Sequence, residues 1–261
     1  MTDWRKEHGA VIHNFLKYLN EKSDNFILKG GTALLMCYKL DRFSEDIDLD
    51  GKTKNIQGIM DGFCQEYAFS YRTAKDTDTV KRYMINYGNN GKPLKVEISF
   101  RRKHIDDSEI TNVNGIKVYN INTLCAMKTN AYSSRDKIRD LYDLTFICNN
   151  YYEQLLPQTL TLLRSALEYK GVEQFDYIMK EQHDELIDEN KLAESFLLMF
   201  DKLGLLFEEK EKQMLLSHET AIIPEKKTLS EVKKTAKEKA VAYNESISSF
   251  PKKTKETDIE L

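Results

Sequence analysis

The chain has 261 residues, of which 41% are hydrophobic and 31% charged, and its formal net charge is −3. This length and composition are those of a globular protein with one large domain or two small ones, and they exclude a disordered chain. The slightly acidic balance excludes a protein that attracts nucleic acid through its overall charge.

The first residues do not have the basic and then apolar pattern of a signal peptide, and no apolar run is long enough to span a membrane. The four cysteines are scattered along the chain, and the five histidines do not have the spacing of metal ligands. We therefore expect a cytoplasmic protein with reduced thiols and no zinc site.

A short strand followed by a glycine turn is the first informative segment. The apolar run at 26–28 predicts a buried strand, and Gly30 and Gly31 then permit a tight turn with close approach to the backbone. Residues 32–38 favour a helix. The free amides and the Thr32 hydroxyl near its start would form an anion site. The alternative is an ordinary strand, turn and helix, with Thr32 as the helix cap.

Acidic and apolar residues alternate at 46–50, as in a strand. Asp46 and Asp48 are two residues apart, so their side chains share one face. Parallel carboxylates repel each other unless a cation lies between them, and magnesium prefers such oxygen ligands. The alternative is a solvated edge strand that ends in a turn at 50–51. Ile47 and Leu49 argue against it, because they indicate burial of the opposite face.

The most regular alternation in the chain occurs at 94–100, which predicts another strand with Glu97 on its polar face. If this strand pairs with the strand of Asp46 and Asp48, three carboxylates converge. Three acids can hold two metal ions, which clamp the attacking and leaving oxygens of a phosphoryl transfer. The alternative for Glu97 is a surface residue on a half-exposed strand.

Residues 122–147 predict one or two helices. Lys128 lies in the first part of this segment. Three acids follow it, and their spacings of four and three residues place them on one helix face. An ion-paired helix face is the alternative, in which Arg135 and Arg139 neutralise the last two of these acids. The acids are Asp136, Asp140 and Asp143.

Helical periodicity replaces strand-like segments after Asn150. Apolar stripes at 160–167 and 196–203, and a capping box formed by Thr228 and Glu231, predict a helical bundle. We therefore expect three parts, namely a first domain at 1–150, a helical bundle at 151–250 and a flexible tail at 251–261.

The combined motifs resemble those of a known family. Gly30-Gly31-Thr32-Ala33-Leu34, a helix and then Ser44-Glu45-Asp46-Ile47-Asp48 resemble the polymerase-β-type nucleotidyltransferase superfamily. With Arg42 and Phe43 included, the pattern is similar to that of the AbiEii/AbiGii toxin nucleotidyltransferases. Lys128 and the stretch 135–144 resemble the closing lysine and Arg-Asp-x-x-Asp motifs of that family. The resemblance covers about the first 150 residues, and Glu97 departs from the aspartate often found at the third acidic position.

The resemblance implies an α+β fold, with a mixed-sheet nucleotidyltransferase domain followed by the helical bundle. It implies a magnesium- or manganese-dependent enzyme that transfers a nucleoside monophosphate from a nucleoside triphosphate (NTP) to a hydroxyl of a tRNA-like RNA or of a protein. It also implies a cognate antitoxin. We expect sheet strands near 26–29, 46–50, 79–87, 94–101 and 116–119.

The same resemblance implies a role for each residue of the site. Asp46, Asp48 and Glu97 would bind metal, with Glu97 as either a ligand or the general base, and Lys128 would contact phosphate as a further catalytic residue. The nucleotide-binding residues would be Gly30, Gly31, Thr32, Arg42, Ser44, Asp140 and Asp143. Two other functions remain open, namely a small-molecule nucleotidyltransferase of the antibiotic-modifying type and a non-catalytic nucleotide-binding module.

Overall fold

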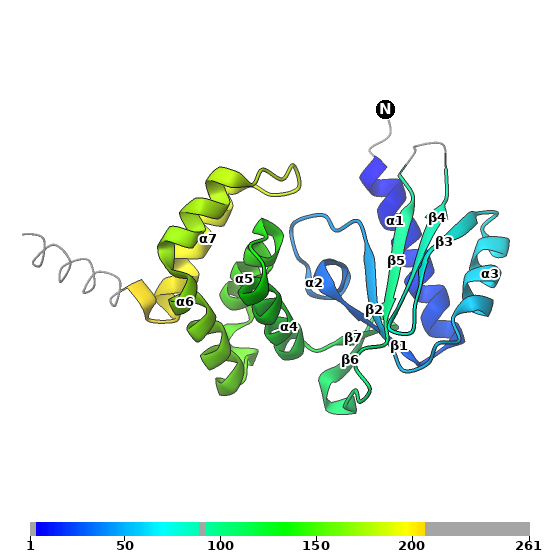
Figure 1. The fold of residues 1–261 in the computed structure, drawn as a ribbon, viewed down its shortest axis with the longest axis horizontal. Coiled ribbons are helices and arrows are strands. Elements are labelled where there is room, and N and C mark those ends of the chain that lie inside the picture. The colour runs from blue at the N-terminus through cyan, green and yellow to red at the C-terminus, as the bar shows by residue number, and fades with distance from the viewer. Residues whose placement is uncertain (1–3, 89–91, 207–261) are drawn as a thin grey trace, which may run out of the picture. The chain divides into compact units, whose positions relative to one another are not determined.

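A seven-stranded mixed sheet is the centre of the computed structural model, which describes residues 4–88 and 92–206 (Figure 1). The strand order is β3-β4-β5-β2-β1-β7-β6. β2 runs parallel to β5, and β1 runs parallel to β7, whereas the other neighbours are antiparallel. The strands are β1 (Phe26–Lys29), β2 (Ile47–Gly51), β3 (Ser70–Asp76), β4 (Val80–Asn86), β5 (Leu94–Ser99), β6 (Ile110–Val113) and β7 (Ile116–Tyr119).

Helices cover both faces of this sheet. α1 and α3 lie on one side, and α2 lies on the other with α4–α7 beyond it (Figure 1). The α-helices are α1 (Trp4–Lys22), α2 (Gly30–Tyr38), α3 (Gln57–Glu66), α4 (Ile121–Ser134), α5 (Ile138–Tyr151), α6 (Pro157–Glu181) and α7 (Glu189–Lys202). Short 3₁₀ helices span Asp107–Glu109 and Tyr152–Gln154.

The central strands bury their apolar positions and leave the alternate polar positions Asp48, Lys95 and Glu97 half-buried. Ile47 and Leu49 of β2 are buried, as are all the apolar residues of β5. In the register of the two strands, Asp48 lies beside Glu97, and on the other side of β2 it pairs with Lys29. The strand alternation therefore sets the polar face from which the candidate site is built.

The C-terminal described helices pack on α4 and α5, with α4 against α6 and α5 against α7. The predicted stripe on α7 is buried, and the rings of Phe175 and Phe196 stack with centroids 4.1 Å apart. Gly171 interrupts the helical geometry of α6 with a φ of +69°, a conformation that glycine adopts readily. The predicted apolar stripes on α6 and α7 are therefore core contacts.

The α+β class with a mixed sheet is confirmed, and so are the five predicted strands. β3 and β6 were not predicted, because β3 is an exposed edge strand without apolar alternation and β6 is a four-residue strand at the other edge. The segment 122–147 forms two helices. Their junction at 135–137 leaves Asp136 outside both, so the expected helix face of three acids is wrong for Asp136.

The described residues up to Leu206 form one compact unit. The boundaries at 150 and 250 remain predictions, and the segment 207–261, with Thr228 and Glu231 of the expected capping box and the expected tail, lies outside the described residues. Among the helices described here, none is long and apolar enough to cross a membrane.

Candidate active site

Three carboxylates meet on the polar face of β2 and β5. Asp46 directly precedes β2, and Asp48 lies in the strand beside Glu97 of β5. Burial raises the pKa of the Asp48 carboxyl above its usual range, and the negative charges of Asp46 and Glu97 raise it further, against the opposing charge of Lys95. The structure therefore brings together the three acids that the sequence analysis singled out, with Asp48 between the other two.

Basic side chains neutralise the two outer acids. Lys95 Nζ lies 2.6 Å from Asp46, and Arg82 Nη2 lies 2.6 Å from Glu97. Within residues 4–88 and 92–206, no group of three His, Cys, Asp or Glu side chains is arranged to hold a metal ion by itself. The donors nevertheless suit magnesium, because they are carboxylate oxygens on one strand face and Asp48 forms no ion pair with the part of the chain that the structure describes.

The glycine pair fits closely against these acids. α2 begins at Gly30, with a φ of +76°, and a Cβ there would come within 2.9 Å of Asp48 Oδ2. A Cβ on Gly31 would come within 2.9 Å of both Arg42 Nη2 and Ser44 Oγ. The absence of a side chain at both glycines therefore leaves space for Asp48, Arg42 and Ser44. The sequence motif alone did not indicate these contacts.

Thr32 lies in the first turn of α2 and is not its cap, so the capping alternative is wrong. Its buried hydroxyl lies 2.9 Å from Ser44 Oγ and also donates to the backbone carbonyl of Asp46. This contact ties the helix to the start of the acid-bearing strand. The Thr32 hydroxyl therefore already has two protein partners. Its direct contact with phosphate remains a prediction.

A buried ion-pair cluster lies next to the acids. Arg42 donates two hydrogen bonds of 2.8 Å to Asp143, and Lys128 lies 2.6 Å from Asp143 and 3.1 Å from Asp140. Burial alone would lower the pKa of Lys128, but the charges of both acids raise it above its usual value. Burial would likewise raise the pKa of Asp140, but hydrogen bonding from Arg135 and the charge of Lys128 hold it below its usual range.

The expected ion pairing of this segment is half correct. Arg135 pairs with Asp140 at 2.7 Å, as the alternative interpretation predicted. Arg139 instead bonds to Asp184, and Asp143 is paired with Arg42 and Lys128. The ion-paired helix face is therefore part of a cluster that links α4, α5 and the loop before β2.

These groups line a cleft of about 750 Å³. Nineteen residues line the cleft, and eight of them belong to the predicted set: Gly31, Arg42, Ser44, Asp46, Asp48, Glu97, Lys128 and Asp140. Gly30 borders the adjoining hollow, whereas Thr32 and Asp143 are buried.

Sequence reasoning missed several residues of the cleft. Lys95 alternates with Glu97 on β5, and Arg82 occupies the facing position on β4, so strand alternation could have found both. Lys137 also lines the cleft, and its side chain makes no ion pair or hydrogen bond with any described residue. The opposite wall is the segment 181–184 at the end of α6, for which the sequence carries no motif.

A second hollow of about 520 Å³ adjoins the cleft. Both spaces are bordered by four residues, namely Asp48, Lys128, Arg135 and Asp140. The second hollow differs in having an apolar wall, which α4 supplies.

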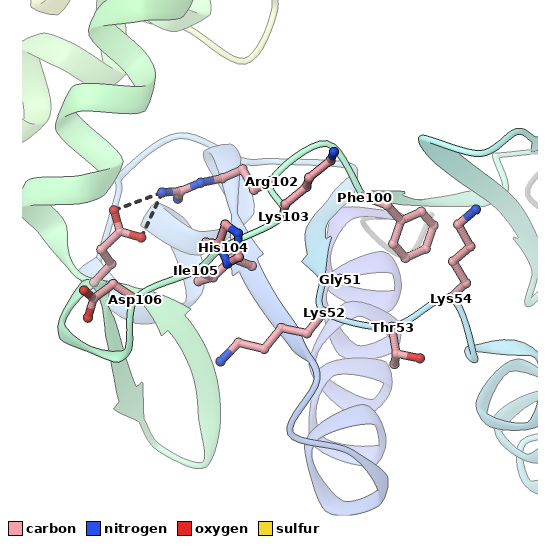
Figure 2. A pocket seen from close by; sticks show the side chains of 11 residues that line it. Gly51, Lys52, Thr53, Lys54, Phe100, Arg102, Lys103, His104, Ile105 and Asp106 are labelled. Atoms are coloured by element: carbon pink, nitrogen blue, oxygen red, sulfur yellow. Dashed lines mark hydrogen bonds and ion pairs between the residues drawn. The ribbon is translucent and has the colours of Figure 1, made fainter.

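A third hollow, of about 570 Å³, lies at the carboxyl ends of β2 and β5 (Figure 2). Lys52 and Lys54 are paired with Asp107 and Asp78, and their ammonium groups point in different directions. Arg102 is held by Glu109 in two hydrogen bonds of 2.9 Å. Because these cations do not converge on one point, we assign no ligand to this hollow.

Comparison with known proteins agrees with this arrangement. The model of the family described as "Nucleotidyl transferase AbiEii toxin, Type IV TA system" matches residues 15–222. The crystal structure of JHP933 from Helicobacter pylori has 26% identity and a TM-score of 0.64, over 84% of this chain and 99% of that one. A candidate nucleotidyltransferase from H. pylori has 28% identity and a TM-score of 0.65, over 82% and 99% of the two chains. No curated protein matches. The chain therefore belongs to the AbiEii family of nucleotidyltransferase toxins.

Proposed function

We propose that this protein is a magnesium-dependent toxin that transfers a nucleoside monophosphate from an NTP to a hydroxyl of RNA or protein, releasing pyrophosphate. One observation carries the proposal. The glycine turn, the Asp46–Asp48 pair and Lys128 are separated by up to about a hundred residues in the sequence, yet they border one charged cleft. A cleft that combines carboxylates with several cations suits a metal-bound polyphosphate.

Asp46 and Asp48 would hold magnesium, and Glu97 would either complete this set or accept the proton of the attacking hydroxyl. Bound magnesium would neutralise charge that develops on the phosphate oxygens. Thr32 would hold the acid-bearing strand against α2 through its contacts with Ser44 and the Asp46 carbonyl. Gly31 would keep the phosphate side of the cleft free of side-chain atoms.

Nucleotide binding would rearrange the ion pairs on the acids. Lys95 pairs with Asp46 across a partly exposed contact, so its ammonium can turn from the carboxylate to a phosphate. Arg82 can leave Glu97 in the same way. Lys137 borders the cleft without a partner among the described residues and would be the first cation that an incoming triphosphate meets.

A labelling experiment tests the proposal. The full chain is incubated with magnesium, each of the four α-³²P-labelled NTPs, and total cellular RNA or lysate protein. We expect one acceptor class to become labelled, in a nuclease- or protease-sensitive form, and we expect Asp46→Asn to abolish labelling. Asp61→Asn is the matched control, because Asp61 is exposed on α3 and bonds only to surface groups.

Labelling by Asp46→Asn at the wild-type rate would contradict the proposed site. Label found only in small molecules would favour the small-molecule enzyme, and NTP binding without any transfer would favour the binding module. Membership of a toxin family also supports a cognate antitoxin. We expect growth arrest on expression of the wild type, relief by the product of an adjacent gene, and no arrest with Asp46→Asn.

A further inference from the structure

The hollow beside the cleft combines properties that the cleft itself lacks. Leu124, Met127 and Ala131 border it, and their spacing places them on one face of α4. Leu124 is buried, whereas Met127 and Ala131 are half-buried and open to this space. Its volume of about 520 Å³ lies within the common range of small-molecule sites, about 300–1,000 Å³.

Polar groups stand at the edge of this apolar wall. Ser99 at the end of β5 and Ser134 at the end of α4 supply hydroxyls. Arg101 is exposed, and its guanidinium makes no ion pair or hydrogen bond with the residues that the structure describes. The rest of the lining is largely charged, so the α4 wall is the apolar surface on which a flat heteroaromatic group would stack; the other charged residues are Lys29, Asp48, Asp50, Arg102, Lys128, Arg135 and Asp140.

The nucleoside of a bound NTP is attached to the same phosphorus that the acids must hold. It therefore has to enter one of the two spaces that Asp48 borders. The larger cleft is lined mostly by charged groups, including Arg82, Lys95 and Arg139, and it has no apolar wall like that of α4 among its described lining residues. A nucleobase buried among these groups would desolvate them without making compensating contacts.

We infer that the hollow between α4 and the ends of β2 and β5 is the nucleobase subsite, with Met127 against the face of the base and Arg101 at its edge. This inference rests on the proposed function, because it assumes that the triphosphate lies in the adjoining cleft. A guanidinium has only donors, so Arg101 favours bases with carbonyl oxygens over adenine, which has none.

Binding of NTPs and of inorganic tripolyphosphate, measured with magnesium by calorimetry on the full chain, separates the two spaces. We expect the wild type to bind its preferred NTP at least tenfold more tightly than tripolyphosphate. Met127→Trp should fill the hollow and reduce NTP affinity to near that of tripolyphosphate, with tripolyphosphate affinity unchanged. Leu162→Trp, on an exposed position of α6, is the matched control and should change neither affinity.

Arg101→Ala gives a second readout, since an exposed residue can be replaced without risk to the fold. We expect Arg101→Ala to reduce severalfold the preference for NTPs with a carbonyl-bearing base over ATP. The affinity for tripolyphosphate should stay unchanged. Unaltered NTP preference and affinity in both variants would overturn the inference. Intact NTP binding with lost acceptor labelling in Met127→Trp would also overturn it, because the hollow would then hold the acceptor. Failure of the wild type to bind either ligand would instead refute the proposed function, and the subsite with it.

Discussion

Two sets of ion pairs lie side by side in this protein, and they differ in how far water reaches them. The side chains of Lys95 and Asp46 are 29% and 41% exposed, whereas those of Arg42 and Asp143 are 4% and 0% exposed. Partly exposed pairs contribute little to stability and exchange easily, whereas loss of one partner from a buried pair leaves an uncompensated charge. The first set is therefore suited to respond to a ligand and the second to fix the framework around it.

Removing Asp143 should break the buried set and give the largest effect on stability. In Asp143→Ala, Arg42 and Lys128 lose their shared carboxylate, and we expect a loss of about 3–5 kcal/mol in the free energy of unfolding. Chemical denaturation measures it. Asp24→Ala removes a partner of Lys117 at a highly exposed position and should leave stability nearly unchanged. Equal losses in the two variants would contradict the distinction between the sets.

Lys128→Met should give an intermediate effect, because each acid keeps one cation, Asp140 with Arg135 and Asp143 with Arg42. We expect a loss of about 1–3 kcal/mol in stability and a clear loss of turnover in protein that remains folded. Denaturation and transfer assays, both run well below the unfolding temperature, separate the two effects. Lowered stability with an unchanged rate would show that Lys128 is only a structural partner.

Lys95→Met should weaken binding and leave the fold intact. We expect about a tenfold loss in affinity for tripolyphosphate, or about 1.4 kcal/mol, with a stability change below about 1 kcal/mol. Lys81→Met, at a strand position paired with Asp76, is the control. A gain in affinity would show that Lys95 competes with the ligand for Asp46 and does not contact phosphate.

Asp48→Asn should stabilise the protein slightly. The pKa of Asp48 is raised in the folded state, so the wild type loses stability as pH rises from the unfolded pKa through the folded one, and an uncharged isostere avoids that loss. We expect a melting temperature roughly 2–4 °C higher at neutral pH, with a smaller difference in acid. A lower melting temperature at neutral pH would contradict this assignment.

Local periodicity was enough to predict the acid-bearing strands. The alternation at 94–99 placed Glu97 on the polar face, and the pairing of β5 with β2 brought it beside Asp48. Lys95 lies on the same polar face of β5, but its role in the site was not predicted, because only the acids of this strand were considered as ligands. The glycine pair was also identified, but its packing against Asp48 and Ser44 depends on contacts between segments that are distant in the sequence.

The missing parts of the site depend on such distant contacts. The helix break at 135–137 changes the direction of the chain, so Asp136 pairs with Lys170 of α6 and leaves the expected face. Arg139 contacts Asp184 over 45 positions of sequence, and no local pattern in either segment indicates that pairing.

Gln182 connects two stretches of the chain that both line the cleft. Its side-chain oxygen accepts a hydrogen bond of 3.0 Å from the backbone amide of Ile138, and its amide donates to the carbonyl of Asp136. A fragment that ends near Asn150 would retain the acids but lose this support and the wall at 181–184. Two separately produced pieces, 1–150 and 151–261, would each lack part of the pocket, so restored nucleotide binding on mixing would report their reassembly.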